Sequence, residues 1–166
     1  MSVEPNNQAV YRTAESVSPK HPDKICDQIS DAILNAYLAK DPQARVAIEA
    51  CGGHGALFLT GEISSSELVD VKQIARRLAG DVKIIKRITR QSPEIAQGVD
   101  AGGAGDQGVI IGYACAETPE LLPLEYALAR ALNRFLYEKW PYDGKTQVTT
   151  YDGQIAAMTT DRKSVV

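Results

Sequence analysis

The order of the apolar patterns along the chain constrains the fold more than any other feature. Apolar alternation and short apolar runs predict strands, and apolar residues spaced three or four apart predict helices. In the first half the patterns give strand, helix, strand, strand, helix and strand, at residues 11–17, 22–40, 44–50, 56–63, 67–78 and 82–89. After a glycine-rich stretch the order starts again, with a strand at 109–115, a helix at 121–137 and a hairpin at 147–151 and 154–160. We therefore expect an α+β protein of two related units, the second of which is incomplete at Val166.

The composition is that of an ordinary globular protein and excludes several classes of function. The 166 residues are 44% hydrophobic and 23% charged with a net charge of −3, which rules out binding to nucleic acid by bulk positive charge. No apolar run approaches the roughly 20 residues needed to span a bilayer, so we expect no membrane partner. The widely separated Cys26, Cys51 and Cys115 offer neither a disulfide framework nor a zinc site. A cytoplasmic location is expected, and the polar residues 1–9 are expected to be frayed.

An imidazole, a carboxylate and an ammonium lie within four residues at the predicted start of a helix, in the stretch His21-Pro22-Asp23-Lys24. The free N–H groups of a helix start favour phosphate, His21 can donate a hydrogen bond to a phosphate oxygen, and Asp23 can hold Mg²⁺. The alternative is a capped helix with a surface histidine. Asp23, Asp27 and Asp31 share one helix face, where their like charges repel each other. A metal or a basic partner would relieve this repulsion, but a solvent-exposed helix face is an equally good interpretation.

Residues 91–108 contain five glycines and almost no large apolar side chain, so we expect a loop. The stretch lacks the Lys-Ser/Thr pair of a phosphate-binding loop, and a predicted strand follows it where a dinucleotide-binding fingerprint would require a helix. Glycine at this density lets a backbone approach a ligand closely or move as a gate. The alternative is a flexible connector. The embedded carboxylate of Asp106 favours contact with a ligand, because an acid gains little from a connector.

Three further charged side chains lie at the predicted strands. Glu49 and Glu62 are on adjacent strands of the first predicted hairpin and are flanked by apolar residues. A carboxylate buried there would need a substrate ammonium, a metal ion or an ordinary arginine. Lys145 follows the turn 142–144 at a strand entry, where a lysine can reach phosphate. For each residue alone, a surface or structural role is the simpler interpretation.

Taken together, these stretches resemble the S-adenosylmethionine synthetase (methionine adenosyltransferase) family. The matching segments keep their order over nearly the whole chain, at residues 15–18, 21–24, 27–32, 41–47, 61–63, 91–100, 103–108 and 143–149. The resemblance implies an α+β fold of intertwined two-layer α/β domains built on βαββαβ repeats, with the third repeat absent. It also implies an N-terminal domain at residues 1–100 and a partial, truncated central domain at residues 101–166.

The same resemblance implies a reaction. The sulfur of L-methionine attacks C5′ of ATP, which forms S-adenosylmethionine and releases tripolyphosphate, and water then cleaves tripolyphosphate to phosphate and diphosphate. By the family's motifs, His21 is a catalytic residue that binds ATP and assists departure of the triphosphate. Lys145, also implied as catalytic, contacts the nucleotide together with Asp143. The residues implied to bind methionine are Glu62, Gln97 and Asp106.

Metals, a moving segment and a partner are implied as well. Asp23 is implied to coordinate Mg²⁺, with two ions expected per site, and Glu49 is implied to hold K⁺. Residues 97–103 are implied to form a mobile loop that gates the site. The implied partners are ATP, L-methionine and further copies of the chain, in a homodimer or higher homo-oligomer with shared active sites. Neither nucleic acid nor a membrane is expected to bind.

The sequence also departs from the family pattern. Family chains carry three repeats, whereas this chain contains the first and part of the second. Pro19 and Lys20 stand where the family has a glutamate and a glycine before the histidine. These departures support an alternative function, that of a truncated, non-catalytic ATP- and methionine-binding or regulatory subunit that pairs with a full-length partner.

Overall fold

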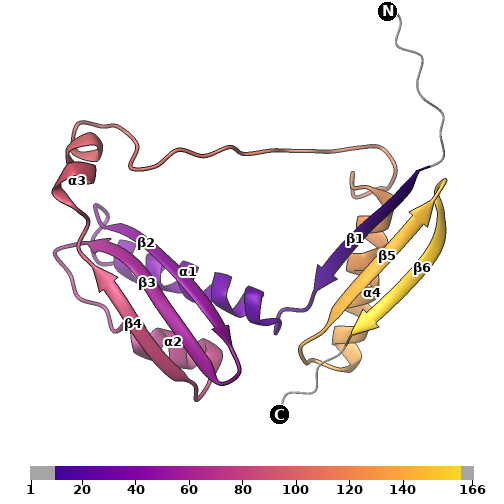
Figure 1. Cartoon of the computed structure of the whole chain (residues 1–166), viewed down its shortest axis with the longest axis horizontal. Helices are drawn as coiled ribbons and strands as arrows, with labels where there is room; N and C mark the ends of the chain where they lie inside the picture. The colour runs from indigo at the N-terminus through magenta and orange to yellow at the C-terminus, as the bar shows by residue number, and fades with distance from the viewer. Residues whose placement is uncertain (1–9, 162–166) are drawn as a thin grey trace, which may run out of the picture. The chain divides into compact units, whose positions relative to one another are not determined.

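The protein, seen here in a computed structural model, is described over residues 10–161, so the stretch 1–9 that was predicted to be frayed and the residues 162–166 lie outside the description. The chain divides into two compact units, residues 22–110 and residues 1–21 with 111–166. In the described part, each unit contains one three-stranded sheet with helical structure on one face (Figure 1), which confirms the predicted α+β class with two-layer units. The linear domain boundary predicted near residue 100 stays a prediction. No helix within residues 10–161 is long and apolar enough to cross a membrane.

Residues 22–110 form a sheet in the order β2-β3-β4. Its elements are α1 (Pro22–Leu38), β2 (Arg45–Gly53), β3 (Ala56–Ser64), α2 (Val71–Ala79), β4 (Lys83–Thr89) and α3 (Pro93–Asp100). Strands β2 and β3 form the predicted antiparallel hairpin, and β3 runs parallel to β4 with α2 as the crossover between them. Helix α2 begins later than the predicted residue 67, because the side chain of Asp70 caps it by accepting from the N–H groups of Lys72 and Gln73.

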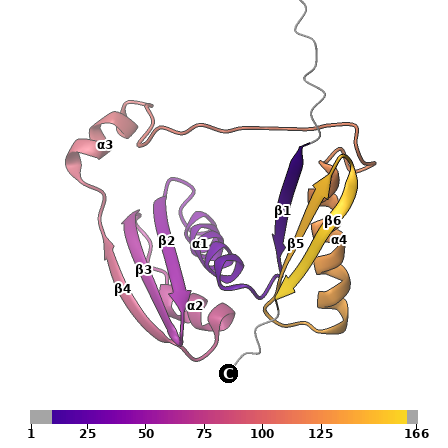
Figure 2. The ribbon, with the colours of Figure 1, turned by 45° about the vertical axis from the view of Figure 1, so that its right-hand side comes forward.

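The core of this unit follows directly from the helical spacing of α1. Ile29, Ile33 and Tyr37 recur every four residues, and all three are buried against the sheet and α2. Along β2 the side chains alternate, so that Ile48 is buried beneath α1 and Glu49 is exposed on the opposite face. Helices α1 and α2 thus cover one face of the sheet (Figure 2).

The second unit combines the two ends of the described chain. Its sheet has the antiparallel order β1-β5-β6, and α4 packs on β1 and β5. The elements are β1 (Tyr11–Val17), α4 (Leu124–Lys139), β5 (Lys145–Tyr151) and β6 (Gln154–Asp161). Val148 and Ala129 are fully buried, and the Thr146 hydroxyl donates to the carbonyl of Ala129 at 2.8 Å, which fixes α4 on β5. Strand β1 precedes α1 in the chain but pairs with β5, in agreement with the intertwined arrangement that the resemblance implies.

Two predictions for residues 91–115 were wrong. Residues 93–100 form α3 within the predicted loop, since Ser92 caps the helix by accepting from Ile95 N at 3.4 Å and Pro93 occupies the first turn. The segment 109–115 is not the predicted buried strand: it pairs with no strand of residues 10–161, and Val109 and Ile111 are 89% and 87% exposed. An apolar run gives the tendency to form a strand, but the strand itself needs a neighbouring sheet edge.

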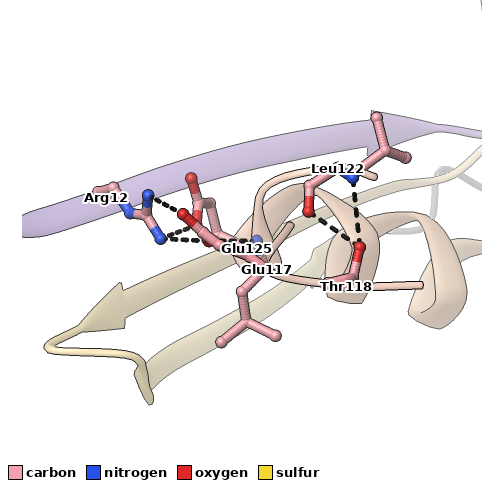
Figure 3. A network of polar contacts seen from close by, with 6 residues as sticks. Arg12, Glu117, Thr118, Leu122 and Glu125 are labelled. Carbon is pink, nitrogen blue, oxygen red and sulfur yellow. Dashed lines mark hydrogen bonds and ion pairs between the residues drawn. The ribbon is translucent and has the colours of Figure 1, made fainter. Parts of the chain in front are cut away.

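An ion-pair network joins β1 to the start of α4 (Figure 3). The Arg12 guanidinium donates to both carboxylate oxygens of Glu117, at 2.8 and 2.6 Å, and lies 3.3 Å from Oε2 of the buried Glu125. Glu117 also accepts from the backbone N–H of Leu124 at 3.0 Å, the first residue of α4, whose N-cap residue Pro123 makes no side-chain cap. The bonds from Arg12 and from this N–H lower the pKa of Glu117 from 4.5 to about 2.

This lowered pKa predicts an acid-dependent contribution to stability. The contribution is fully present above pH 4.5 and disappears as the pH falls toward about 2, because the unfolded carboxyl takes its proton first. Glu117→Gln should therefore lower the urea midpoint at pH 7, and the difference from the wild type should shrink as the pH falls through this window. Glu120→Gln, an exposed change in the same segment, is the control. A difference that is constant between pH 7 and pH 2 would contradict the account.

Candidate functional site

Two sequence motifs that were predicted to contact a nucleotide are held together by Ser18. Its backbone N–H donates to the carbonyl of Gly144 at 2.8 Å, and its hydroxyl donates to the carbonyl of Tyr142 at 2.9 Å. The N–H of Gly144 donates back to the Ser18 hydroxyl at 3.0 Å, and the N–H of His21 donates to the Ser18 carbonyl at 3.0 Å. Ser18 is only 2% exposed. The turn that ends at His21 is therefore fixed against the turn that contains Asp143.

A cavity of about 210 Å³ lies beside these turns, within the unit formed by the chain ends. Its walls include Trp140 and Tyr142 as aromatic surfaces, and Asp143 and Asn133 as polar groups. Aromatic surface next to a few polar groups is typical of small-molecule sites. Sequence reasoning had not singled out Trp140 or Asn133, because an aromatic residue at the end of a helix and an amide within the helix carry no motif.

The ammonium group of Lys145 is engaged with a carboxylate. It forms an ion pair with Glu15 across the β1–β5 pairing, and Glu15 also accepts from the side chain of Gln147 at 3.0 Å. The hydrogen bond from Lys145 holds the pKa of Glu15 below its usual value. Because Thr146 and Val148 are buried beneath α4, the alternation of the strand places Lys145 on the other face of the sheet. A phosphate that reached Lys145 would have to compete with Glu15.

The aspartates of α1 form no metal centre by themselves. Asp23 lies in the first turn of α1, Asp27 is paired with Lys24 at 3.0 Å, and Asp31 is exposed. Over residues 10–161, no group of three or more His, Cys, Asp or Glu side chains is placed to hold a metal ion. Mg²⁺ commonly takes one or two protein carboxylates and completes its shell with phosphate and water. Asp23 fits that kind of site, as one ligand to a metal that a nucleotide carries.

A second group of predicted residues meets within residues 22–110. Glu49, Glu62 and Asp106 line one open pocket of about 560 Å³, together with Arg45 and Gln91. Three carboxylates around one space create a strongly negative region that suits an ammonium group or a cation. Gln97, by contrast, is exposed on α3 and does not line this pocket.

Two sequence expectations about the pocket of Glu49, Glu62 and Asp106, called the acidic pocket below, need correction. Glu49 is exposed on the sheet face opposite α1 and Glu62 is half-buried, so the argument from a buried carboxylate does not apply to Glu49. The implied gating loop at 97–103 is also not entirely a loop, because its first four residues end α3. Both differences follow from local structure, since strand alternation exposes Glu49 and the Ser92 cap starts a helix.

Gly61 sets the backbone next to Glu62. Its φ is +134°, and a Cβ built there would lie 1.9 Å from the carbonyl oxygen of Ala47 on β2. Only glycine allows the two strands to approach this closely. Gly61 itself lines the acidic pocket, so this contact shapes the pocket as well as the hairpin.

Arg45 is a pocket residue that sequence reasoning missed. Its guanidinium donates to the side chain of Gln91 at 3.3 Å and forms an ion pair with Asp100. Nothing in the sequence indicated these contacts, because residues 91–108 were predicted as a loop and a loop does not predict that Gln91 and Asp100 lie close together. The arrangement ties the start of β2 to both ends of α3.

Comparison with known proteins finds matches along nearly the whole chain. Residues 9–97 match the family described as S-adenosylmethionine synthetase, N-terminal domain, and residues 101–165 match its central domain. An S-adenosylmethionine synthase of Synechococcus sp. (strain RCC307) is 43% identical over an aligned length of 171 residues, gaps included, and the match covers 82% of this chain and 42% of that relative. S-adenosylmethionine synthase 1 of Frankia casuarinae is 44% identical over an aligned length of 178 residues, gaps included, and the match covers 85% of this chain and 44% of the relative. The chain thus spans about two fifths of the length of these relatives.

Proposed function

Because the chain belongs to the S-adenosylmethionine synthetase family, we propose that it binds ATP and L-methionine and contributes to transfer of the adenosyl group to the methionine sulfur. The products are S-adenosylmethionine and tripolyphosphate, and water then cleaves tripolyphosphate to phosphate and diphosphate. The observation that carries the proposal is the meeting of Glu49, Glu62 and Asp106 at one pocket, since these residues come from three separate stretches of the sequence.

In this proposal the acidic pocket takes methionine. The ammonium group of the amino acid interacts with Glu62 and Asp106, and the apolar side chains of Ile95 and Val99 in the pocket wall offer a surface for its thioether arm. Gln97 lies on α3 and is exposed, so it reaches the ligand only after a rearrangement of α3. Glu49, an exposed residue of the pocket lining, is the proposed ligand for K⁺.

The turns joined by Ser18 take the nucleotide. His21 binds ATP and, as a hydrogen-bond donor or a cation, stabilises negative charge on the departing triphosphate. Asp143 contacts the nucleotide, and Lys145 supplies positive charge once phosphate displaces Glu15. Asp23 supplies one ligand to Mg²⁺, and the two ions expected per site would neutralise the phosphates when bound.

The chemistry asks for positioning and charge stabilisation rather than for a base. A thioether is a neutral, modest nucleophile with no proton to lose, so its alignment with C5′ decides the rate of attack. The leaving group is a polyanion, which cationic side chains and a helix N-terminus stabilise. We further propose that the chain acts in the cytoplasm and assembles with itself as a homodimer or a higher homo-oligomer.

Calorimetric titration followed by a product assay tests the proposal. ATP with Mg²⁺ and methionine should each bind the chain, and S-adenosylmethionine should form when both are present. Binding without product supports the alternative, a binding or regulatory subunit that pairs with a full-length partner, which a mixture with such a partner would then test. Failure of both ligands to bind would contradict both functions.

His21→Asn should remove most of the turnover. Asparagine keeps a hydrogen-bond donor but cannot become a cation at the leaving group, and loss of such stabilisation costs about 100-fold in rate. The fold should remain intact, because the Ser18–His21 turn is closed by the backbone N–H of residue 21. The measurement is S-adenosylmethionine formation at saturating substrates, with circular dichroism to check the fold. Turnover equal to that of the wild type would remove His21 from the proposed mechanism.

A further inference from the structure

Helix α3 has little apolar anchoring of its own. It has eight residues, none of them buried. Helices this short are not stable in isolation, so tertiary contacts decide where α3 lies. Contacts that hold its two ends therefore largely determine where α3 lies.

Arg45 makes such contacts at both ends of α3. One guanidinium nitrogen donates to Gln91, two residues before the helix begins, and another pairs with Asp100, its last residue. An exposed ion pair alone contributes little. A planar guanidinium that joins two partners in a fixed geometry is more ordered, and here it lies at the first residue of β2, which the paired strands hold rigidly.

The position of α3 in turn decides the position of Asp106. The N–H of Gly102 donates to the carbonyl of Val99 at 3.0 Å, and the N–H of Gly103 donates to the carbonyl of Gly98 at 2.9 Å, so the chain turns back directly after α3. At Gly105 a Cβ would lie 3.1 Å from Cγ2 of Val99. The glycine-rich segment thus packs back onto α3 immediately before Asp106.

We propose that Arg45 is a positioning residue for methionine: by holding both ends of α3 on β2, it places Asp106 in the acidic pocket beside Glu62. Arg45 acts through α3 and does not itself take the ligand, because its guanidinium is engaged with Gln91 and Asp100. The inference deepens the proposed function and rests on it for the identity of the ligand. The placement of α3 by Arg45 does not depend on that identity.

Arg45→Ala and Asp100→Asn test the placement. In the full chain, each variant should raise hydrogen exchange of the amides at 93–106 and weaken methionine binding about fivefold, with ATP binding unchanged. The double variant should be no worse than Arg45→Ala, because Arg45→Ala already removes the contact with Asp100. Exchanging the charges, Arg45→Asp with Asp100→Arg, should restore part of the protection. Arg77→Ala, the same loss of charge on the exposed side of α2, is the control and should change neither readout.

The results separate the placement of α3 by Arg45 from the proposed binding of methionine. Unchanged exchange at 93–106 in Arg45→Ala overturns the placement. Faster exchange with unchanged methionine affinity also overturns the inference, because Arg45 would then only support the local structure. If the wild type binds no methionine at all, the proposed function fails and the positioning of that ligand fails with it, whereas the exchange data still decide whether Arg45 places α3.

Discussion

Gly61→Ala is expected to destabilise the unit of residues 22–110 by about 3 kcal/mol. The new methyl group would lie 1.9 Å from the Ala47 carbonyl oxygen, at a φ of +134° that side chains rarely adopt. The nearest atoms are backbone atoms of β2, so the clash cannot be relieved by rotating a flexible side chain. The two strands must separate where Ile48 faces Gly61, in the middle of the hairpin. Urea denaturation followed by circular dichroism measures the loss.

Gly53→Ala provides the matched control. Gly53 belongs to the same hairpin, but a Cβ there would meet nothing within 4 Å and its φ is ordinary. The control should change the free energy of unfolding by only a few tenths of a kcal/mol, about the scale of a surface substitution. If Gly61→Ala were as stable as Gly53→Ala, the close approach of β2 and β3 would be wrong, and with it the position of Glu62.

Glu62→Gln is expected to weaken methionine binding about 20-fold, because the amide keeps the shape of the side chain and loses the charge that faces the ammonium group. Glu62 is half-buried in the pocket wall, where solvent screens its charge less than at the surface. ATP binding should not change, since no residue assigned to the nucleotide lines this pocket. Calorimetric titration of each ligand measures both effects.

Glu67→Gln removes the same charge from an exposed position outside the pocket and serves as the control. It should leave the methionine affinity within a factor of two of the wild type, which is the scale of a distant screened charge. Equal losses for Glu62→Gln and Glu67→Gln would show that only net charge matters. The acidic pocket would then not be the methionine site.

Local patterns predicted the elements with strong periodicity. The four-residue spacing of Ile29, Ile33 and Tyr37 defines the buried face of α1, and the glycine-containing turn at residues 52–55 defines the hairpin. Family motifs then named Glu49, Glu62 and Asp106, which the structure brings to one pocket. These features depend on residues close together in the sequence, so the local sequence is sufficient to predict them.

Features that depend on a distant partner could not be read from the sequence. The pattern of β1 predicts a strand but does not say that its neighbour is β5, more than a hundred residues away. The apolar segment 109–115 has the composition of a buried strand but lacks a sheet neighbour among residues 10–161. Arg45 looks like an ordinary strand residue until α3 brings Gln91 and Asp100 to it. Strand pairing and contacts between distant side chains depend on tertiary structure, so they cannot be predicted from the local pattern of one sequence.

The central claim is that the two ligands use separate groups of residues, methionine the acidic pocket and nucleotide the turns joined by Ser18. Mapping backbone amide NMR shifts during separate titrations tests this most directly. Methionine should move amides of β2, β3 and residues 91–106, and ATP with Mg²⁺ should move those of residues 18–24 and 142–146. Methionine shifts confined to the Ser18 turns, or an absence of shifts around Glu62 and Asp106 at saturating methionine, would contradict the account.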